Sequence, residues 1–151
     1  MKRKMARSAL RIILFATLVA LAPVAQAHGC SMSDVAGNYG YTSSGTIVTP
    51  PVGAFATVGH VTFGPTGNLS GAQKTSIAGN FFDETVSGTY SVNPDCTGTA
   101  TVNIYHGTTL ARTTNLNLVW DDNQKEVRAI FLTAGTVITI DAKKIFHEAE
   151  D

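Results

Sequence analysis

The stretch TGTATVNIYHGTTLARTTNLNLVW, residues 97–120, decides the fold class of this 151-residue chain. In its first part, Thr, Asn and Tyr alternate with Gly, Ala, Val and Ile. Near its end, Leu116, Leu118 and Trp120 share one face, and asparagines lie on the other. Alternation with a period of two indicates strands with one buried face, and His106-Gly107 between them fits a tight turn. The stretch therefore predicts a β-hairpin.

The same alternation continues on both sides of this hairpin, where clusters of Gly, Pro, Asn and Asp interrupt it at short intervals. No stretch before the C-terminal tail has apolar residues at helical spacing. We therefore predict eight strands, at residues 38–44, 54–63, 68–77, 82–92, 97–105, 108–120, 126–133 and 136–144.

Eight consecutive strands joined by short turns form an antiparallel meander. An open meander leaves two exposed edges that invite aggregation, and closing the sheet into a barrel removes them. We predict an all-β fold in which an eight-stranded antiparallel meander closes into a small barrel. A two-sheet β-sandwich is the alternative, but its Greek-key connections need a long crossover, and the only long gap is Gly45–Gly53. An outer-membrane barrel is disfavoured because Thr and Asn occupy much of one strand face.

The first 27 residues have the order of a secretory signal peptide. A basic start is followed by the apolar run Ile12–Ala22 and the small-x-small site Ala25-Gln26-Ala27. Because a membrane-spanning helix needs about 20 apolar residues, this run is too short to be an anchor. We expect cleavage after Ala27, no stable membrane anchor afterwards, and a location in the periplasm or outside the cell. Acylation of Cys30 is the alternative, but His28 fits poorly before it.

The net charge of zero averages two unlike parts of the chain. Five of the 11 basic residues lie within residues 1–11, so six basic residues face 11 acidic ones in the remainder. This mildly acidic remainder lacks the basic surface that nucleic-acid binding requires. A hydrophobic content of 44% also excludes a disordered chain. We expect one barrel domain at residues 28–146 and an acidic C-terminal tail at 147–151.

Cys30 and Cys96 are the only cysteines. Export would place them in an oxidising compartment, where thiols pair, so we expect a disulfide between them. The bridge would tie the start of the mature chain to the turn at Asn93-Pro94-Asp95. A nucleophilic or metal-binding thiol is the alternative, but neither cysteine has a motif partner.

Three phrases together resemble a known group of proteins. They are AGNYGY at residues 36–41 after Cys30, VGHVTFGPTGNLSG at 58–71 and SGTYSVNPDCTGT at 87–99. The group comprises small exported bacterial proteins with calycin-like barrels, close in shape to allene oxide cyclase and dirigent barrels. One departure is Gly64-Pro65, where the group usually has Asp-Gly. The resemblance implies a barrel and supports the pairing of Cys30 with Cys96, but it brings no established catalytic residues.

Four residues are candidates for binding a ligand inside such a barrel. His60 lies in the second expected strand and would reach the lumen if it faced inward. Asp83 and Glu84 must point to opposite faces, and we take Glu84 as the inward one, where burial would raise its pKa. Tyr90 and Trp120 are aromatic residues suited to lining a pocket, although such residues are more often ordinary core. The alternative for His60 is a histidine on the surface, and the alternative for Glu84 is a solvated carboxylate.

No catalytic residue, cofactor or metal site is expected. The histidines at positions 28, 60, 106 and 147 lack a metal-ligand spacing. The first functional hypothesis is non-enzymatic binding of a small apolar ligand in the lumen. The second is a structural or interaction protein of the envelope or exterior with a packed lumen. The third is an allene oxide cyclase-like isomerase, which rests on analogy of fold.

Overall fold

The computed structural model describes residues 29–145. The expected signal peptide at residues 1–27 and the acidic tail at 147–151 lie outside the described residues. No helix within residues 29–145 is long and apolar enough to cross a membrane.

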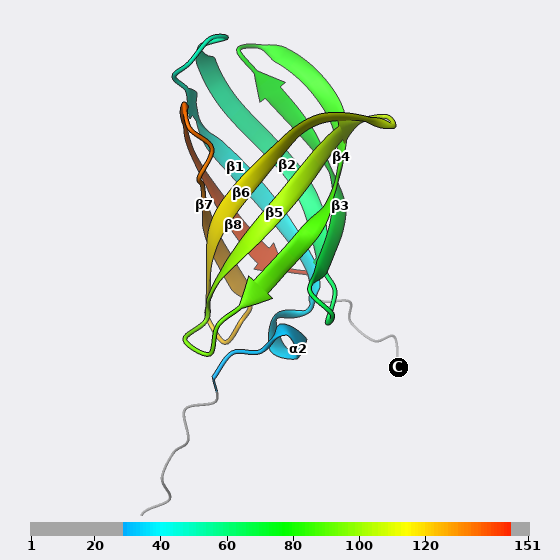
Figure 1. Cartoon of the computed structure of the whole chain (residues 1–151), viewed down its shortest axis with the longest axis vertical. Helices are drawn as coiled ribbons and strands as arrows, with labels where there is room; N and C mark the ends of the chain where they lie inside the picture. Colours follow the sequence, from blue (N-terminus) through cyan, green and yellow to red (C-terminus); the bar gives the residue numbers. More distant parts are fainter. Residues whose placement is uncertain (1–28, 146–151) are drawn as a thin grey trace, which may run out of the picture.

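Eight antiparallel strands form one closed barrel in the order of the sequence, and β1 pairs with β8 to close it (Figure 1). The all-β fold and the closed eight-stranded meander are thus confirmed, and the sandwich alternative is wrong. The strands are β1 (Gly37–Ile47), β2 (Gly53–Phe63), β3 (Asn68–Ile77), β4 (Asn80–Val92), β5 (Thr97–His106), β6 (Thr109–Asp121), β7 (Glu126–Phe131) and β8 (Thr136–Lys144).

Most of the strands lie where the sequence predicts them, and β3 and β8 have the predicted bounds. The main difference is β1, which continues to Ile47 and so enters the connection expected at Gly45–Gly53. It continues because Ile47 pairs with Gly53 on β2 and with Thr136 on β8. The connection between β1 and β2 therefore shortens to residues 48–52, which include a cis peptide bond between Pro50 and Pro51.

A short helix, α2 (Met32–Val35), precedes β1 and was not expected. Ser31 caps it: its backbone N–H and its hydroxyl both donate to Asp34 Oδ2, at 2.9 and 2.6 Å. A Ser followed three residues later by an acidic residue is the sequence sign of such a cap. The helix lies at the end of the barrel where the described chain begins and ends, which we call the floor end (Figure 1). The opposite end is the mouth end.

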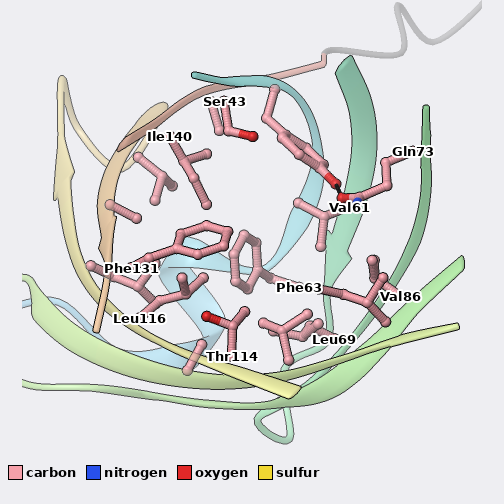
Figure 2. Close-up of a pocket in the computed structure, with 18 of the residues that line it drawn as sticks. Ser43, Val61, Phe63, Leu69, Gln73, Val86, Thr114, Leu116, Phe131 and Ile140 are labelled. Carbon is pink, nitrogen blue, oxygen red and sulfur yellow. Dashed lines mark hydrogen bonds between the residues drawn. The ribbon is translucent and has the colours of Figure 1, made fainter. Parts of the chain in front are cut away.

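The alternation seen in residues 97–120 sets which side chains enter the barrel. Ala100, Ile104 and Leu118 are buried, whereas Thr99 and Asn117 on the opposite face are exposed. Inward-facing side chains from all eight strands meet in the lumen and make one core (Figure 2).

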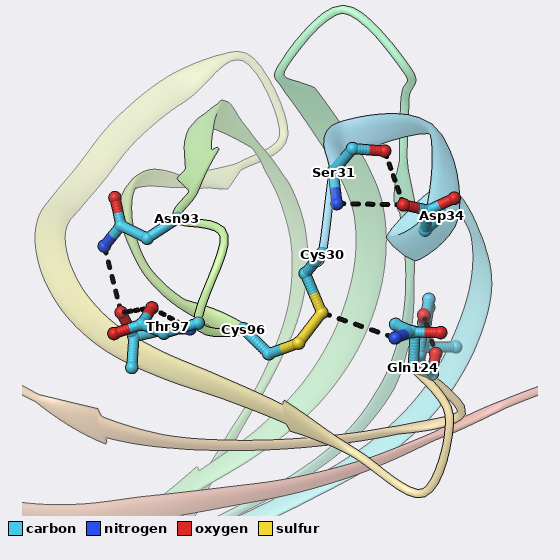
Figure 3. Close-up of a disulfide and its surroundings, with 9 residues drawn as sticks. Cys30, Ser31, Asp34, Asn93, Cys96, Thr97 and Gln124 are labelled. Atoms are coloured by element: carbon cyan, nitrogen blue, oxygen red, sulfur yellow. Dashed lines mark hydrogen bonds between the residues drawn. A yellow bond between two sulfur atoms is a disulfide. The ribbon is translucent and has the colours of Figure 1, made fainter. Parts of the chain in front are cut away.

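The disulfide between Cys30 and Cys96 is confirmed, with the two Cα atoms 5.0 Å apart (Figure 3). It ties the segment before α2 to the β4–β5 turn, where the Cys30 N–H also donates to the Pro94 carbonyl at 3.1 Å. Gln124 of the β6–β7 turn donates to Cys30 Sγ at 3.4 Å, and its carbonyl accepts from the Tyr39 hydroxyl at 2.8 Å. The bridge therefore holds α2 and two turns together across the floor end.

We expect Gly98→Ala to lower the free energy of unfolding by about 1–3 kcal/mol, because there is no room for a methyl group at this position. A Cβ at Gly98 would lie 2.2 Å from the Ser91 carbonyl oxygen and 2.7 Å from the Trp120 ring. Urea unfolding gives the measurement. Gly40→Ala is the matched control, because its Cβ would meet only Ile145 at 3.6 Å. Equal midpoints for the two variants would contradict the steric argument.

Candidate functional site

The lumen has four features, which are an aromatic floor, an inner cavity, a mouth cavity and a polar cluster. The lowest is an aromatic floor of Tyr39, Phe63, Tyr90 and Trp120. The Phe63 ring contacts the other three rings edge-on, with centroids 5.4 Å from Tyr39, 4.8 Å from Tyr90 and 5.9 Å from Trp120. Together with α2 and the disulfide, these rings close the barrel at the floor end.

Above the floor lies an inner cavity of about 70 Å³ (Figure 2). Its wall is apolar except at Tyr41, Ser43, Gln73 and Thr114. Space remains because several inward positions carry small side chains, among them Ala100, Ala129 and Ala142. The remaining lining residues are Phe55, Val61, Phe63, Leu69, Val86, Val102, Ile104, Leu116, Leu118, Val127, Phe131 and Ile140.

A second cavity of about 90 Å³, the mouth cavity, lies toward the mouth end. It shares Phe55, Thr114 and Phe131 with the inner cavity. The rings of Phe55 and Phe131 meet edge-on with centroids 5.9 Å apart, so this pair stands between the two cavities. Phe131 is half-buried and is the last residue of β7.

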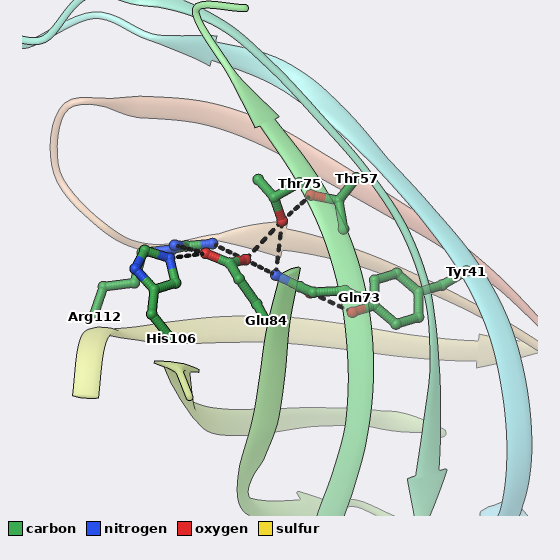
Figure 4. Close-up of polar contacts among 7 residues, drawn as sticks. All are labelled: Tyr41, Thr57, Gln73, Thr75, Glu84, His106 and Arg112. Carbon is green, nitrogen blue, oxygen red and sulfur yellow. Dashed lines mark hydrogen bonds and ion pairs between the residues drawn. The ribbon is translucent and has the colours of Figure 1, made fainter. Parts of the chain in front are cut away.

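The fourth feature is a polar cluster centred on Glu84, whose side chain is fully buried (Figure 4). Arg112 donates to both carboxylate oxygens, from Nη1 at 2.5 Å and from Nη2 at 2.9 Å. Thr75 Oγ1 and Gln73 Nε2 donate to Oε2 at 2.7 and 2.5 Å, and His106 Nε2 lies 2.9 Å from Oε1. The Glu84 carboxylate is thus surrounded by hydrogen-bond donors on both oxygens.

These hydrogen bonds decide the charge of the cluster. Burial alone would raise the pKa of Glu84, but hydrogen bonds from Arg112, Thr75 and Gln73 outweigh it and lower this pKa to about 2. The expected rise in the pKa of Glu84 is therefore wrong. Glu84 is ionised at neutral pH, and the Arg112 guanidinium balances its charge. Burial and the Glu84 charge raise the pKa of Tyr41, whose hydroxyl donates to Gln73 Oε1.

The cluster reaches solvent through two side chains, Arg112, which is 27% exposed, and His106, which is 43% exposed. An ionised carboxylate can only accept a hydrogen bond, so His106 donates from Nε2 to Glu84. The imidazole also stacks on the Phe82 ring, with centroids 5.0 Å apart. His106 therefore sits in a fixed orientation where the lumen opens.

A β-bulge lies beside Arg112. Residue 104 pairs with Arg112, but residue 105 pairs with Leu110, so Ala111 has no partner on β5. The extra residue breaks the alternation, so Leu110 is exposed although it is even-numbered like the inward residues. Arg112 keeps the alternation of Thr114 and Leu116 and points into the barrel.

The four predicted ligand-binding residues lie in different places. Glu84 faces inward, within the polar cluster. Tyr90 and Trp120 are buried in the floor below the inner cavity and do not line it. His60 is exposed on the outer face of β2, away from the lumen. Ligand binding by any of the four stays a prediction.

The lumen also contains residues that the sequence analysis did not single out, chiefly Gln73, Arg112 and Phe131. The sequence could have indicated Arg112, because within residues 97–120 it alternates in step with Thr114 and Leu116, which face inward. Among the described residues, no three or more His, Cys, Asp or Glu side chains are grouped so that they could hold a metal ion.

A scan against protein-family models, a search of curated proteins and a search of solved structures each found no match to this chain. The resemblance to exported calycin-like barrels therefore rests on the three quoted phrases. The closed eight-stranded barrel is the part of that resemblance that the structure shows.

Proposed function

We propose that this barrel binds a small apolar molecule in its lumen and releases it unchanged. The inner cavity is the observation that carries the proposal. Its wall is mainly apolar, the aromatic floor closes it on one side, and the Phe55–Phe131 pair separates it from the mouth cavity. Apolar concave sites with a few polar groups at one end are the usual form of small-molecule sites.

The cavity volumes indicate the size of the ligand. An apolar cavity of about 150 Å³ holds one benzene molecule. The inner cavity of about 70 Å³ is too small alone, but with the mouth cavity of about 90 Å³ it reaches this size if the Phe131 ring turns aside. A single aromatic ring or a short branched alkyl group therefore fits best. Drug-sized ligands need roughly 300 Å³ or more.

The state of Glu84 supports binding over catalysis. A general base works best when its pKa lies near the working pH, whereas the pKa of Glu84 is lowered to about 2. Its oxygens are also occupied by donors from Arg112, Thr75, Gln73 and His106. We assign the cluster the role of holding the mouth end of the lumen in shape.

The disulfide supports a location in an oxidising compartment, because such bonds persist in secreted and periplasmic proteins. The proposed site of action is therefore the periplasm or the exterior of the cell.

We expect benzene to stabilise the protein and Ala129→Val to abolish that effect. Benzene at ten times its dissociation constant should raise the free energy of unfolding by about 1.4 kcal/mol, which thermal unfolding reports as a higher Tm. Ala129 is buried in the wall of the inner cavity, so two added methyl groups occupy the space that benzene needs. The variant should therefore be insensitive to benzene.

Ala56→Val is the matched control, because Ala56 is exposed on the outer face of β2. It makes the same chemical change outside the lumen and should keep the full benzene effect. An equal benzene effect in the Ala129→Val variant would refute the lumen as the site. No effect of benzene on the unchanged protein would refute the proposed ligand class and favour a packed lumen.

A further inference from the structure

The two ends of the barrel differ in charge. At the mouth end, residues 48–52, 78–81, 107–110 and 132–135 comprise the four turns and the first two residues of β4 and of β6, and we call them the mouth rim. The rim contains no Asp, Glu, Lys, Arg or His, although His106, which is 43% exposed, directly precedes its third turn. At the floor end, by contrast, α2 and the turns carry the charged residues Asp34, Asp95, Asp122 and Lys125.

The mouth rim also carries large apolar side chains that no described residue covers. Each of the four rim segments contributes at least one of them. The four connections lie at the same end of the barrel (Figure 1). The most exposed is Phe81, at 76%. The others are Val48, Val52, Leu110 and Leu132, each more than half exposed.

We propose that the mouth rim docks on the surface of a lipid bilayer, so that the lumen opens toward the lipid. Apolar side chains at loop tips bury favourably at the boundary between headgroups and acyl chains, whereas a charged side chain becomes costlier the deeper it enters the acyl chains. The complete absence of charge from four separate turns matches this environment. The threonine hydroxyls of the rim, such as Thr49 and Thr108, are suited to hydrogen bonds with lipid headgroups.

A protein partner fits the mouth rim less well. Protein interfaces are enriched in aromatic residues, Met and Arg, and the rim contains a single aromatic residue, Phe81, and no Met or Arg. Its apolar side chains stand on separate turns around an opening instead of forming one flat patch. The absence of charge also selects the lipid: docking does not need anionic headgroups, so neutral phosphatidylcholine should suffice.

The docking does not depend on the proposed ligand binding, but it adds a source for the ligand. An apolar molecule that partitions into lipid would reach the mouth cavity without crossing water. The Phe55–Phe131 pair would then be the first barrier on its way to the inner cavity.

Flotation with phosphatidylcholine vesicles tests the proposal. The protein is residues 28–151, which contain the whole barrel and the disulfide and leave out the apolar N-terminal segment. We expect it to float with the vesicles equally well in 0.1 and 0.5 M NaCl, because salt screens only charge interactions. The variant Phe81→Ser/Leu110→Ser should bind at least roughly tenfold more weakly, since a buried apolar side chain of this size contributes that much.

The matched control is Val119→Ser/Ile130→Ser, which removes two exposed apolar side chains from the outer wall, 47% and 46% exposed. This control should float like the unchanged protein. Circular dichroism and Tm establish that both variants are folded. A tryptophan placed by Phe81→Trp should shift its emission to the blue on vesicles, whereas one placed by Val119→Trp should not.

Four results would overturn the proposal. The first is that the protein does not float with the vesicles, and the second is that the rim and wall variants lose vesicle binding equally. The third is binding to anionic vesicles only, which is lost at the higher salt concentration. The fourth is a dimer in solution that depends on the rim residues, without vesicle binding. The benzene measurement separates this proposal from ligand binding. Flotation without a benzene effect would refute the lumenal site alone, and a benzene effect without flotation would refute the docking alone.

Discussion

Replacing Arg112 with methionine should lower the free energy of unfolding by about 3–5 kcal/mol at pH 7, because it leaves a buried carboxylate without its counter-charge. The Glu84 side chain has no exposed surface, and Arg112 supplies two of its hydrogen bonds. Chemical denaturation measures the change. The double variant Arg112→Met/Glu84→Gln should recover most of the loss, since the neutral amide no longer requires a charge partner.

The pH dependence distinguishes this explanation from a simple loss of packing. With Arg112 present, the pKa of Glu84 is about 2 in the folded state against 4.5 ordinarily. Glu84 therefore stabilises the protein above about pH 4.5, and this contribution is lost as the pH falls toward 2. Without Arg112, Glu84 loses the main interaction that lowers its pKa, so this pKa rises. Acid should therefore reduce the difference in the free energy of unfolding between the variant and the unchanged protein.

Arg128→Met is the matched control. Arg128 is 65% exposed and lies 3.2 Å from Asp121 in a surface ion pair. Such pairs contribute roughly 0–1 kcal/mol, so this variant should be nearly as stable as the unchanged protein. An equally small effect of Arg112→Met would show that Glu84 is not held as the structure has it.

Removing the disulfide with Cys30→Ser/Cys96→Ser should lower the free energy of unfolding by about 4 kcal/mol. The bridge closes a loop with a sequence separation of 66, and the loss of that constraint favours the unfolded chain. The native state is affected as well, because Cys30 holds α2 over the floor, where Val35 and Tyr39 are fully buried. Urea unfolding gives the measurement.

A reducing agent provides the control for this prediction. It should lower the urea midpoint of the unchanged protein to that of the double serine variant and leave the variant itself unaffected. If the reductant lowered the urea midpoints of the unchanged protein and of the variant equally, its effect would not come from the disulfide. Identical midpoints for the oxidised protein and the variant would contradict a stabilising bridge.

Much of the fold follows from the sequence because strand periodicity is a local property. Residues 97–120 alternate on both sides of their turn, and their even-numbered apolar residues are buried in the barrel except Leu110, which precedes the β-bulge. The turn signals, such as Asn93-Pro94-Asp95, separate the strands at the right places. The cysteine pairing was also predictable, because only two cysteines exist.

The candidate site was harder to predict because it depends on relations between distant residues. Glu84 was expected to face inward, but its pKa depends on Arg112, 28 positions later, and on Gln73 and Thr75 of the neighbouring strand. The approach of Arg112 to Glu84 depends in turn on the pairing of β5 with β4 and with β6. The direction of the His60 side chain follows from the register of β2, which places this side chain on the outer face of the barrel.

The sequence alone therefore determined the strands, their order, the buried faces and the disulfide, since each follows from spacing along the chain. Only the tertiary structure decided the charge state of Glu84, the volumes of the two cavities and the uncharged rim around the mouth. A cavity is a small difference between the space that a closed barrel encloses and the side chains that fill it. A rim exists only once closure brings four separate turns to one end. Neither can be read from spacing along the chain.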